Sequence, residues 1–112
     1  MAQAPDLETL KRDAACGIAP AQYNLGVWHL QQHGPEADYE AARVCLEAAA
    51  EQGFAPAMSA LGYMLLRAQG VGYDPEAAAG LFLRAAEAGF PEARYRLGEM
   101  YGAGYGRPQD AE

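Results

Sequence analysis

Apolar residues recur along the chain at the spacing of helices rather than of strands. Around Leu25, steps of 100° per residue place Ala21, Trp28 and His29 on the same face as Leu25. Alanine, the best helix former, is abundant, whereas Val, Ile and Thr, which favour strands, are scarce. The pattern predicts an all-α protein with six helices, over about residues 6–16, 20–32, 38–52, 55–68, 74–88 and 91–102.

The sequence repeats itself with a period of 36 residues. Residues 17–52 align with residues 53–88 without a gap and are identical at 15 of 36 positions, and residues 89–112 begin a third copy. A fixed period of this length is typical of a solenoid, in which each unit buries its apolar face against its neighbours. We therefore expect an α–α superhelical solenoid of helical hairpins, each about 36 residues long.

Residues that begin and end helices recur at fixed places in each copy. Three glycines are placed to close a helix in the left-handed conformation, namely Gly17, Gly53 and Gly89. Three prolines fall in the first turn of the helix that follows, namely Pro20, Pro56 and Pro91. Three aspartates are placed to cap the second helix of a unit, namely Asp38, Asp74 and Asp110. The recurrence predicts the same helix–turn–helix unit in every copy.

Glycine also recurs inside the first helix of each unit, at Gly26 and Gly62. Each costs about 1 kcal/mol relative to alanine in a helix. Because both stand at the same place in the repeat, close contact between helices is the expected compensation.

The glycine-rich stretch QGVGYDPEAA, at residues 69–78, permits two interpretations: a phosphate-binding loop or a corner between helices. It lacks the Lys and the Ser or Thr of a phosphate loop. Gly70 recurs as Gly34 and Gly106 at the period of the whole chain. The pattern favours a corner, in which Gly70 and Gly72 let the first helix end and reverse.

The repeats divide one domain, residues 1–112, into four parts. We expect an N-terminal capping half-repeat at 1–16, repeats at 17–52 and 53–88, and a partial third repeat with a loose tail at 89–112. Where the middle copy has Met58, Ala60 and Tyr63, the last copy has polar residues that suit a water-facing cap: Arg94, Arg96 and Glu99.

Charge and composition exclude several partner classes. The formal net charge is −7, so the surface repels phosphate backbones and anionic lipids, and we expect neither nucleic acid nor membrane as a partner. No apolar run is long enough to span a bilayer, and the N-terminus has no signal-peptide pattern, which predicts a cytoplasmic location. Cys16 and Cys45 are expected to be reduced, partly buried thiols rather than a disulfide.

The units AQYNLGVWHLQQHG, DYEAARVCLEAAAEQGFAPAMSALGYMLLRAQGVGYDPEAA and PEARYRLGEMYGAGYGRPQD resemble the Sel1-like repeat family, a relative of the tetratricopeptide repeats. The resemblance covers about residues 17–112. It implies helical hairpins stacked into a right-handed superhelix that holds other proteins together, and it implies no reaction. The aromatic of its Leu-Gly-x-x-Tyr motif is kept at Tyr101 but replaced by His29 and Leu65, and an aromatic common in the second helix is replaced by Cys45 and Leu81.

The sequence contains few candidates for catalytic or metal-binding residues. His29 and His33 are four apart, on one helical face, but Leu30 stands where a zinc protease motif carries its glutamate. Glu36, Asp38 or Cys45 could complete such a site, but the next copy holds Leu65 and Gln69 at the positions of the two histidines, which favours ordinary helix residues. Ser59, the one serine, is replaced by tyrosine in the other copies. We predict no catalytic residue, no metal and no cofactor.

The stronger candidate for function is the side of the first helices turned away from their leucine anchor. In the related tetratricopeptide repeats this side lines the concave groove that takes peptides. In this chain we expect its arginines to pair with acidic groups of a partner and its tyrosines to stack on apolar ones. We define the first-helix face by six residues: Tyr23, Asn24, Tyr63, Arg67, Tyr95 and Arg96. The rival hypothesis for the nearby aliphatics Val27, Leu30 and Leu66 is that they pack between neighbouring repeats.

Two functions follow from these patterns. The first is a non-enzymatic adaptor or scaffold, a monomer or weak homodimer that binds a peptide or a helix of another protein on the first-helix face. The second is a small acidic inhibitor of the bacterial immunity type that neutralises a basic toxin or effector, which fits the size and the charge.

Overall fold

The structure is a computed structural model that describes residues 6–31, 38–69 and 72–102, and the structural statements below refer to these residues. It contains six helices: α1 (Leu7–Ala15), α2 (Ala19–Leu30), α3 (Tyr39–Glu51), α4 (Ala55–Arg67), α5 (Pro75–Glu87) and α6 (Pro91–Gly102). The described residues contain no strand, which confirms the all-α prediction. The predicted helix bounds differ from the observed ones by at most two residues.

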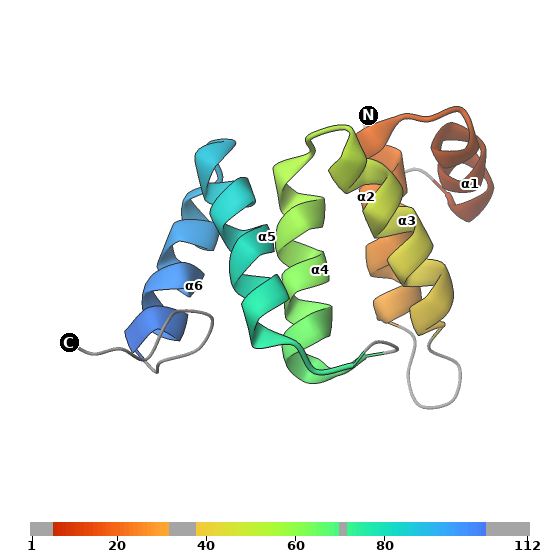
Figure 1. Cartoon of the computed structure of the whole chain (residues 1–112). Coiled ribbons are helices and arrows are strands. Elements are labelled where there is room, and N and C mark those ends of the chain that lie inside the picture. The colour runs from red at the N-terminus through yellow and green to blue at the C-terminus, as the bar shows by residue number, and fades with distance from the viewer. Residues whose placement is uncertain (1–5, 32–37, 70–71, 103–112) are drawn as a thin grey trace.

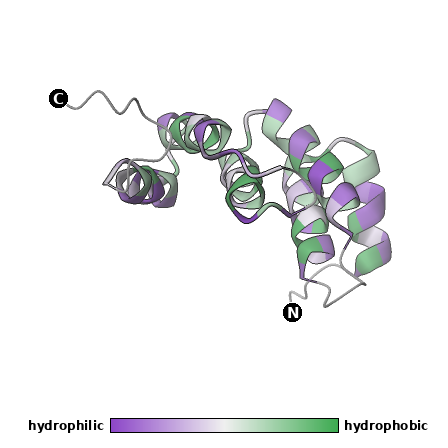
Figure 2. Ribbon diagram, turned by 60° about the horizontal axis from the view of Figure 1, so that its bottom comes forward, coloured by the Kyte–Doolittle hydropathy of each residue, from purple (hydrophilic) through white to green (hydrophobic). Residues whose placement is uncertain are grey.

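The helices follow one another along the long axis of the molecule, which measures 53 × 32 × 24 Å. Each helix packs on the next in chain order, and α2 also contacts α4. Figure 1 shows this order running from α1 at one end to α6 at the other. Each helix carries both hydrophobic and hydrophilic residues, because one side of it faces its neighbours and another faces water (Figure 2). The predicted α–α solenoid is therefore the observed architecture.

The turn between one hairpin and the next has the same geometry each time. Gly17, Gly53 and Gly89 have φ angles of 87°, 85° and 95°, in the left-handed region that favours glycine. After α3, Gly53 N–H donates to the Ala50 carbonyl at 2.9 Å and Phe54 N–H donates to the Ala49 carbonyl at 3.2 Å. These paired bonds satisfy the last carbonyls of the helix, as in a Schellman motif.

Aspartate side chains close the N-terminal ends of the second helices, as predicted. The Asp38 carboxylate accepts from Ala41 N–H, and the Asp74 carboxylate accepts from Ala77 N–H, each at 3.0 Å. Asp6 caps α1 in the same way, accepting from Thr9 N–H at 2.8 Å, and this bond lowers the pKa of the Asp6 carboxyl. Asp110 and the recurrent Gly34, Gly70 and Gly106 lie outside the described residues.

The glycines inside the first helices lie against large side chains of the second helices. A Cβ added to Gly26 would lie 2.8 Å from Leu46 Cγ, and one added to Gly62 would lie 2.9 Å from Phe82 Cζ. Leu46 and Phe82 are both completely buried. The predicted close contact is therefore real, and any larger residue at Gly26 or Gly62 would displace a packed side chain.

The end of α4 is formed by a residue that the sequence pattern did not single out, while Gly70, to which the pattern assigned the reversal together with Gly72, lies outside the described residues. The left-handed residue there is Ala68, at φ 54°, and its N–H donates to the Met64 carbonyl. Gln69 N–H donates to the same carbonyl at 3.0 Å, and Asp74 N–H donates to the Leu65 carbonyl at 3.1 Å. The helix thus ends at Arg67, and its C-terminal cap is Ala68, a residue that carries a Cβ.

Candidate functional site

The six residues of the first-helix face come from α2, α4 and α6, and the structure brings four of them together. Tyr63 and Arg67 of α4 lie one turn apart, and Tyr95 and Arg96 of α6 lie next to them. The guanidinium of Arg67 lies 5.5 Å from the centre of the Tyr63 ring, and that of Arg96 lies 5.2 Å from the same centre. Tyr63 therefore has a cation–π contact from each of two helices.

One side of the Tyr63 ring packs against the hydrophobic core. It meets the ring of the buried Phe82 of α5 edge to face, with centres 5.5 Å apart and planes at 82°. Tyr63 is half-buried, and this burial is the main reason that the pKa of its hydroxyl is raised. The hydroxyl therefore stays protonated at neutral pH and can donate a hydrogen bond.

Arg96 was expected to offer a free charge to a partner, and the structure corrects this. Its guanidinium forms ion pairs with Glu99 at 2.9 Å and with Glu92 at 3.7 Å, both on its own helix. The hydrogen bond that Arg96 donates to the Glu99 carboxylate is the main reason that the pKa of Arg96 is raised. Arg96 also lies over the Tyr95 ring, at 5.5 Å, and is half-buried rather than facing water as a cap residue would. Its charge is therefore largely satisfied inside the chain.

Arg67 has a different environment. It is exposed, in the last turn of α4, and within the described part of the chain it forms no ion pair. It lines a pocket of about 310 Å³ together with Leu30 at the end of α2 and with Ala60, Tyr63 and Gln69. We call this the Tyr63 pocket. It combines an apolar wall, a guanidinium, an amide and a phenol at one place between two first helices.

The two α2 residues of the first-helix face are not part of this group. The Tyr23 ring packs against Phe54, with centres 5.6 Å apart, at the turn that precedes α4. Asn24 is exposed. Neither residue lines the Tyr63 pocket, to which α2 contributes Leu30 instead.

Two of the three aliphatic residues near this face, Leu30 and Leu66, pack as the rival hypothesis predicts. Leu30 and Leu66 are half-buried and pack against the main core. Ser59, which the helical period places on the same side as Tyr63, is buried at 3 % exposure. First helices in this fold therefore bury more than the stripe centred on their leucine, because they touch helices on both sides.

The groups weighed for metal and thiol chemistry are scattered. His29 lies beside Trp28, with ring centres 5.1 Å apart, while His33 and Glu36 lie outside the described residues. No cluster of three His, Cys, Asp or Glu side chains suited to a metal occurs in the described ranges. Both cysteines are free, and burial raises the pKa of the Cys45 thiol. Cys16 is exposed, whereas the sequence had suggested that it is partly buried.

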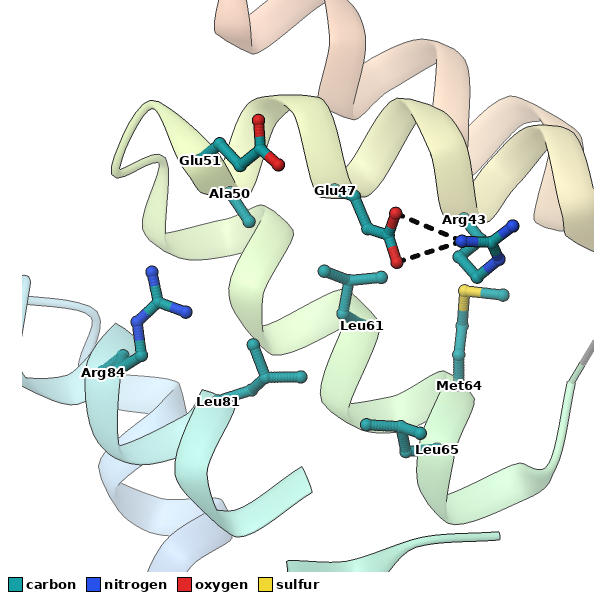
Figure 3. A pocket seen from close by; sticks show the side chains of 9 residues that line it. All are labelled: Arg43, Glu47, Ala50, Glu51, Leu61, Met64, Leu65, Leu81 and Arg84. Carbon is teal, nitrogen blue, oxygen red and sulfur yellow. Dashed lines mark hydrogen bonds and ion pairs between the residues drawn. The ribbon is translucent and has the colours of Figure 1, made fainter. Parts of the chain in front are cut away.

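A second cavity, of about 280 Å³, was not anticipated from the sequence. It lies between α3, α4 and α5, and its walls include Leu61, Met64, Leu65 and Leu81 (Figure 3). The one available signal was the absence of an aromatic residue at position 65, where the other copies carry His29 and Tyr101.

Of the helices in the described ranges, none combines the length and the apolar character needed to cross a bilayer.

Comparison with protein families gives one match that extends over most of the chain. The family model described as Sel1 repeat matches residues 19–54, 55–90 and 91–112. The first two matched segments have the 36-residue length of the repeat seen in the sequence, displaced by two residues from its predicted limits. Among curated proteins, no match to this chain is found.

The solved structures that are similar to this chain include two repeat proteins of bacteria. One is a protective antigen present in uropathogenic Escherichia coli strains that displays an SLR fold, with a TM-score of 0.85 and 37 % identity. The similarity covers 92 % of this chain and 22 % of the antigen. The other is a Sel1 repeat protein from Oxalobacter formigenes, with a TM-score of 0.76 and 39 % identity, which covers 90 % of this chain and 76 % of that protein.

Proposed function

The chain belongs to the Sel1 repeat family, and from this membership we propose that it is a non-enzymatic adaptor module that binds a protein segment at the Tyr63 pocket. Sel1 repeat proteins generally mediate protein–protein interactions, and the family typically consists of interaction modules rather than enzymes. The proposal adds the place of binding and the chemistry of the partner segment.

The proposal rests mainly on the exposure of Arg67 and on its lack of an ion pair within the described residues. Arg67 lies at the edge of a pocket that also has an apolar wall. A carboxylate of the partner would pair with Arg67 without breaking an existing bond. An apolar side chain of the same segment would lie against Leu30 and Ala60.

The rigidity of Tyr63 supports the same proposal. The contact with Phe82 and the two guanidinium contacts hold the ring in place before a partner arrives. Binding then loses little side-chain entropy, which is one reason why tyrosine and arginine dominate interface energetics. Arg96 serves in this proposal as a support for Tyr63 rather than as the residue that pairs with the partner.

A partner segment of one helix or one extended peptide fits the size of the site. The Tyr63 pocket, at about 310 Å³, accommodates a single anchor residue, and the exposed Tyr95, which contacts Arg96 beside Tyr63, is available for a flanking residue. The expected partner segment therefore has one apolar anchor with an acidic residue close to it.

The test is affinity capture from lysate with quantitative mass spectrometry, comparing the wild type with Arg67→Glu. Arg12→Glu is the matched control, because Arg12 is also exposed and also lies in the last turn of its helix, α1. Both changes remove a favourable cation from a helix C-terminus and add the same charge, so their effects on folding are similar. Arg67→Glu avoids the loss of core packing that Tyr63→Ala would cause.

We expect Arg67→Glu to reduce recovery of specific partners at least about tenfold, which corresponds to about 1.4 kcal/mol, while Arg12→Glu retains them. Equal recovery with both variants contradicts the proposal. If the retained partner is in addition a strongly basic protein, the acidic inhibitor hypothesis is the better explanation.

A further inference from the structure

The cavity between α3, α4 and α5 lies on a different side of α4 from the Tyr63 pocket. We call it the Leu65 pocket. Its apolar surface comes from Leu61, Met64 and Leu65 of α4 and from Leu81 of α5. At 100° per residue, these α4 positions lie roughly 120° around the helix from Ala60, Tyr63 and Arg67. A ligand in the Leu65 pocket would therefore leave the Tyr63 pocket free.

At the Leu65 pocket, this copy of the repeat lacks a ring that the other copies carry at the corresponding position of the sequence. Leu65 corresponds to His29 in the copy before and to Tyr101 in the copy after. The preceding position is Met64, where the first copy has Trp28. Leu65 and Leu81 are both half-buried, so the apolar walls are reached from outside. The cavity therefore offers an apolar, accessible space of about 280 Å³ beside a position at which the other copies carry a ring.

The charges around the Leu65 pocket are of two kinds. On one side Arg43 is held by Glu40 at 2.6 Å and by Glu47 at 3.1 Å, so its charge is satisfied within α3. Figure 3 shows Arg43 and Glu47 on one side of the leucines and Arg84 on the other. Arg84 is exposed and forms no ion pair in the described ranges. It is the cation of this pocket that remains available.

We propose that the Leu65 pocket binds an aromatic side chain of a peptide partner that carries a carboxylate next to the ring, with the carboxylate paired to Arg84. The aromatic side chain lies against Leu61, Leu65 and Leu81, at the place in the repeat where the other copies carry His29 and Tyr101 in the sequence. Burying a ring there removes apolar surface from water on both molecules. Glu51, also exposed on the wall of the pocket, accepts an N–H of the peptide backbone.

The proposal does not depend on the function proposed for the Tyr63 pocket, because different residues and a different side of α4 carry it. Arg67 takes no part in it, and Arg84 takes no part in the other. Failure of one site in its own test therefore leaves the other site untouched.

The direct test is NMR titration of the isotope-labelled full chain with the capped peptide acetyl-Ala-Phe-Asp-Ala-amide. Two further peptides test the two interactions separately. One has Asn in place of Asp and lacks the carboxylate, and the other has Ala in place of Phe and lacks the ring. We expect the Phe-Asp peptide to shift the methyl signals of Leu61, Met64, Leu65 and Leu81, with a Kd on the order of 1 mM or tighter. The Asn peptide should bind about three- to tenfold more weakly, and the Ala peptide should not bind.

Variants of the protein test whether the peptide binds in the Leu65 pocket. Leu65→Tyr returns the missing ring and should abolish binding, with the fold checked by circular dichroism and thermal unfolding. Leu81→Phe fills the pocket from α5 and gives the same test should Leu65→Tyr fail to fold. Arg84→Gln should lower the affinity for the Phe-Asp peptide to that for the Asn peptide, while Arg12→Gln, at an exposed arginine of α1, should leave it unchanged.

Unchanged affinity in a folded Leu65→Tyr or Leu81→Phe variant would overturn the proposal. So would methyl shifts confined to residues outside the Leu65 pocket, or equal affinities for the Asp and Asn peptides.

Discussion

Gly62 and Gly98 stand at the same place in the repeat, yet their surroundings differ. Gly62 of α4 lies against the ring of Phe82, so close that an added Cβ would come within 2.9 Å of it. Around Gly98 of α6, no described atom lies within 4 Å of such a Cβ. The difference is the second helix: α5 packs on α4 on this side, and the described residues contain no helix after α6.

The comparison shows that a repeated residue need not have a repeated role. In the middle repeat, glycine is required because two helices approach closely. At α6, no side chain of the described residues packs on Gly98, so that within them nothing compensates the cost of its flexibility. It also explains why α6 carries exposed residues such as Arg94, Tyr95 and Glu99 on its surface. The middle repeat supplies packing, and α6 supplies a surface on which Arg96 supports Tyr63.

The largest effect should come from the ring that α5 places against α4. Phe82→Ala is expected to lower the free energy of unfolding by about 3–5 kcal/mol, because Phe82 is completely buried and Tyr63 loses its contact. Tyr95→Ala in α6 is the control: Tyr95 is 63 % exposed, so the change should stay within about 0.5 kcal/mol. Urea unfolding measures both, and similar losses would mean that α6 is packed as tightly as α5.

The next largest change in the free energy of unfolding should come from replacing Gly62 or Gly98. Gly62→Ala should lower the free energy of unfolding, since overpacking costs about 1–3 kcal/mol and the better helix propensity of alanine returns only about 1 kcal/mol. Gly98→Ala should raise it by up to about 1 kcal/mol, because alanine there meets no described atom. Changes of the same sign in the two variants would refute the comparison.

The turn glycines should behave alike in both regions. Gly53 precedes α4 and Gly89 precedes α6, and both have a positive φ with open space around them. Replacing either by alanine should therefore lower the free energy of unfolding by about 1 kcal/mol, through backbone strain alone. Thermal unfolding of the two variants is the check, and a loss at Gly53 without a loss at Gly89 would show that α6 contributes little to the folded unit.

The smallest effect concerns the end of α4. Ala68→Gly should raise the free energy of unfolding by about 0.5 kcal/mol, because glycine adopts the φ of 54° without strain, although it adds entropy to the unfolded chain. Ala88, at the end of α5, has a φ of −83°, so Ala88→Gly should instead be destabilising. The opposite signs are measurable by urea unfolding, and a loss at Ala68 would contradict the left-handed assignment.

Much of the fold could be predicted because it depends on residues that act locally. Glycine at a positive φ and aspartate at a helix start have one main use each, and the 36-residue period shows which of them belong together. The close contacts at Gly26 and Gly62 were also predictable, since no other reason favours glycine at that phase of a helix.

The candidate site could be predicted only in part, because it depends on side-chain pairing in three dimensions. The spacing of Glu92, Arg96 and Glu99 permits ion pairs along α6, but it does not show that these would satisfy the charge of Arg96. Likewise, Leu65 and Leu81 are far apart in the sequence, and only the packing of α5 on α4 makes them walls of one pocket. Ala68 is an unusual left-handed residue, which propensity alone would not select.

The difference between α4 and α6 can be measured directly by native-state hydrogen exchange of the full chain, read residue by residue by NMR. The account predicts that the slowest amides lie in α4 and α5, where they exchange only on global unfolding, and that α6 amides exchange faster through local opening. This follows from second helices packed on α4 and from the lack of a described helix after α6. Amides of α6 that exchange as slowly as those of α4 would contradict it.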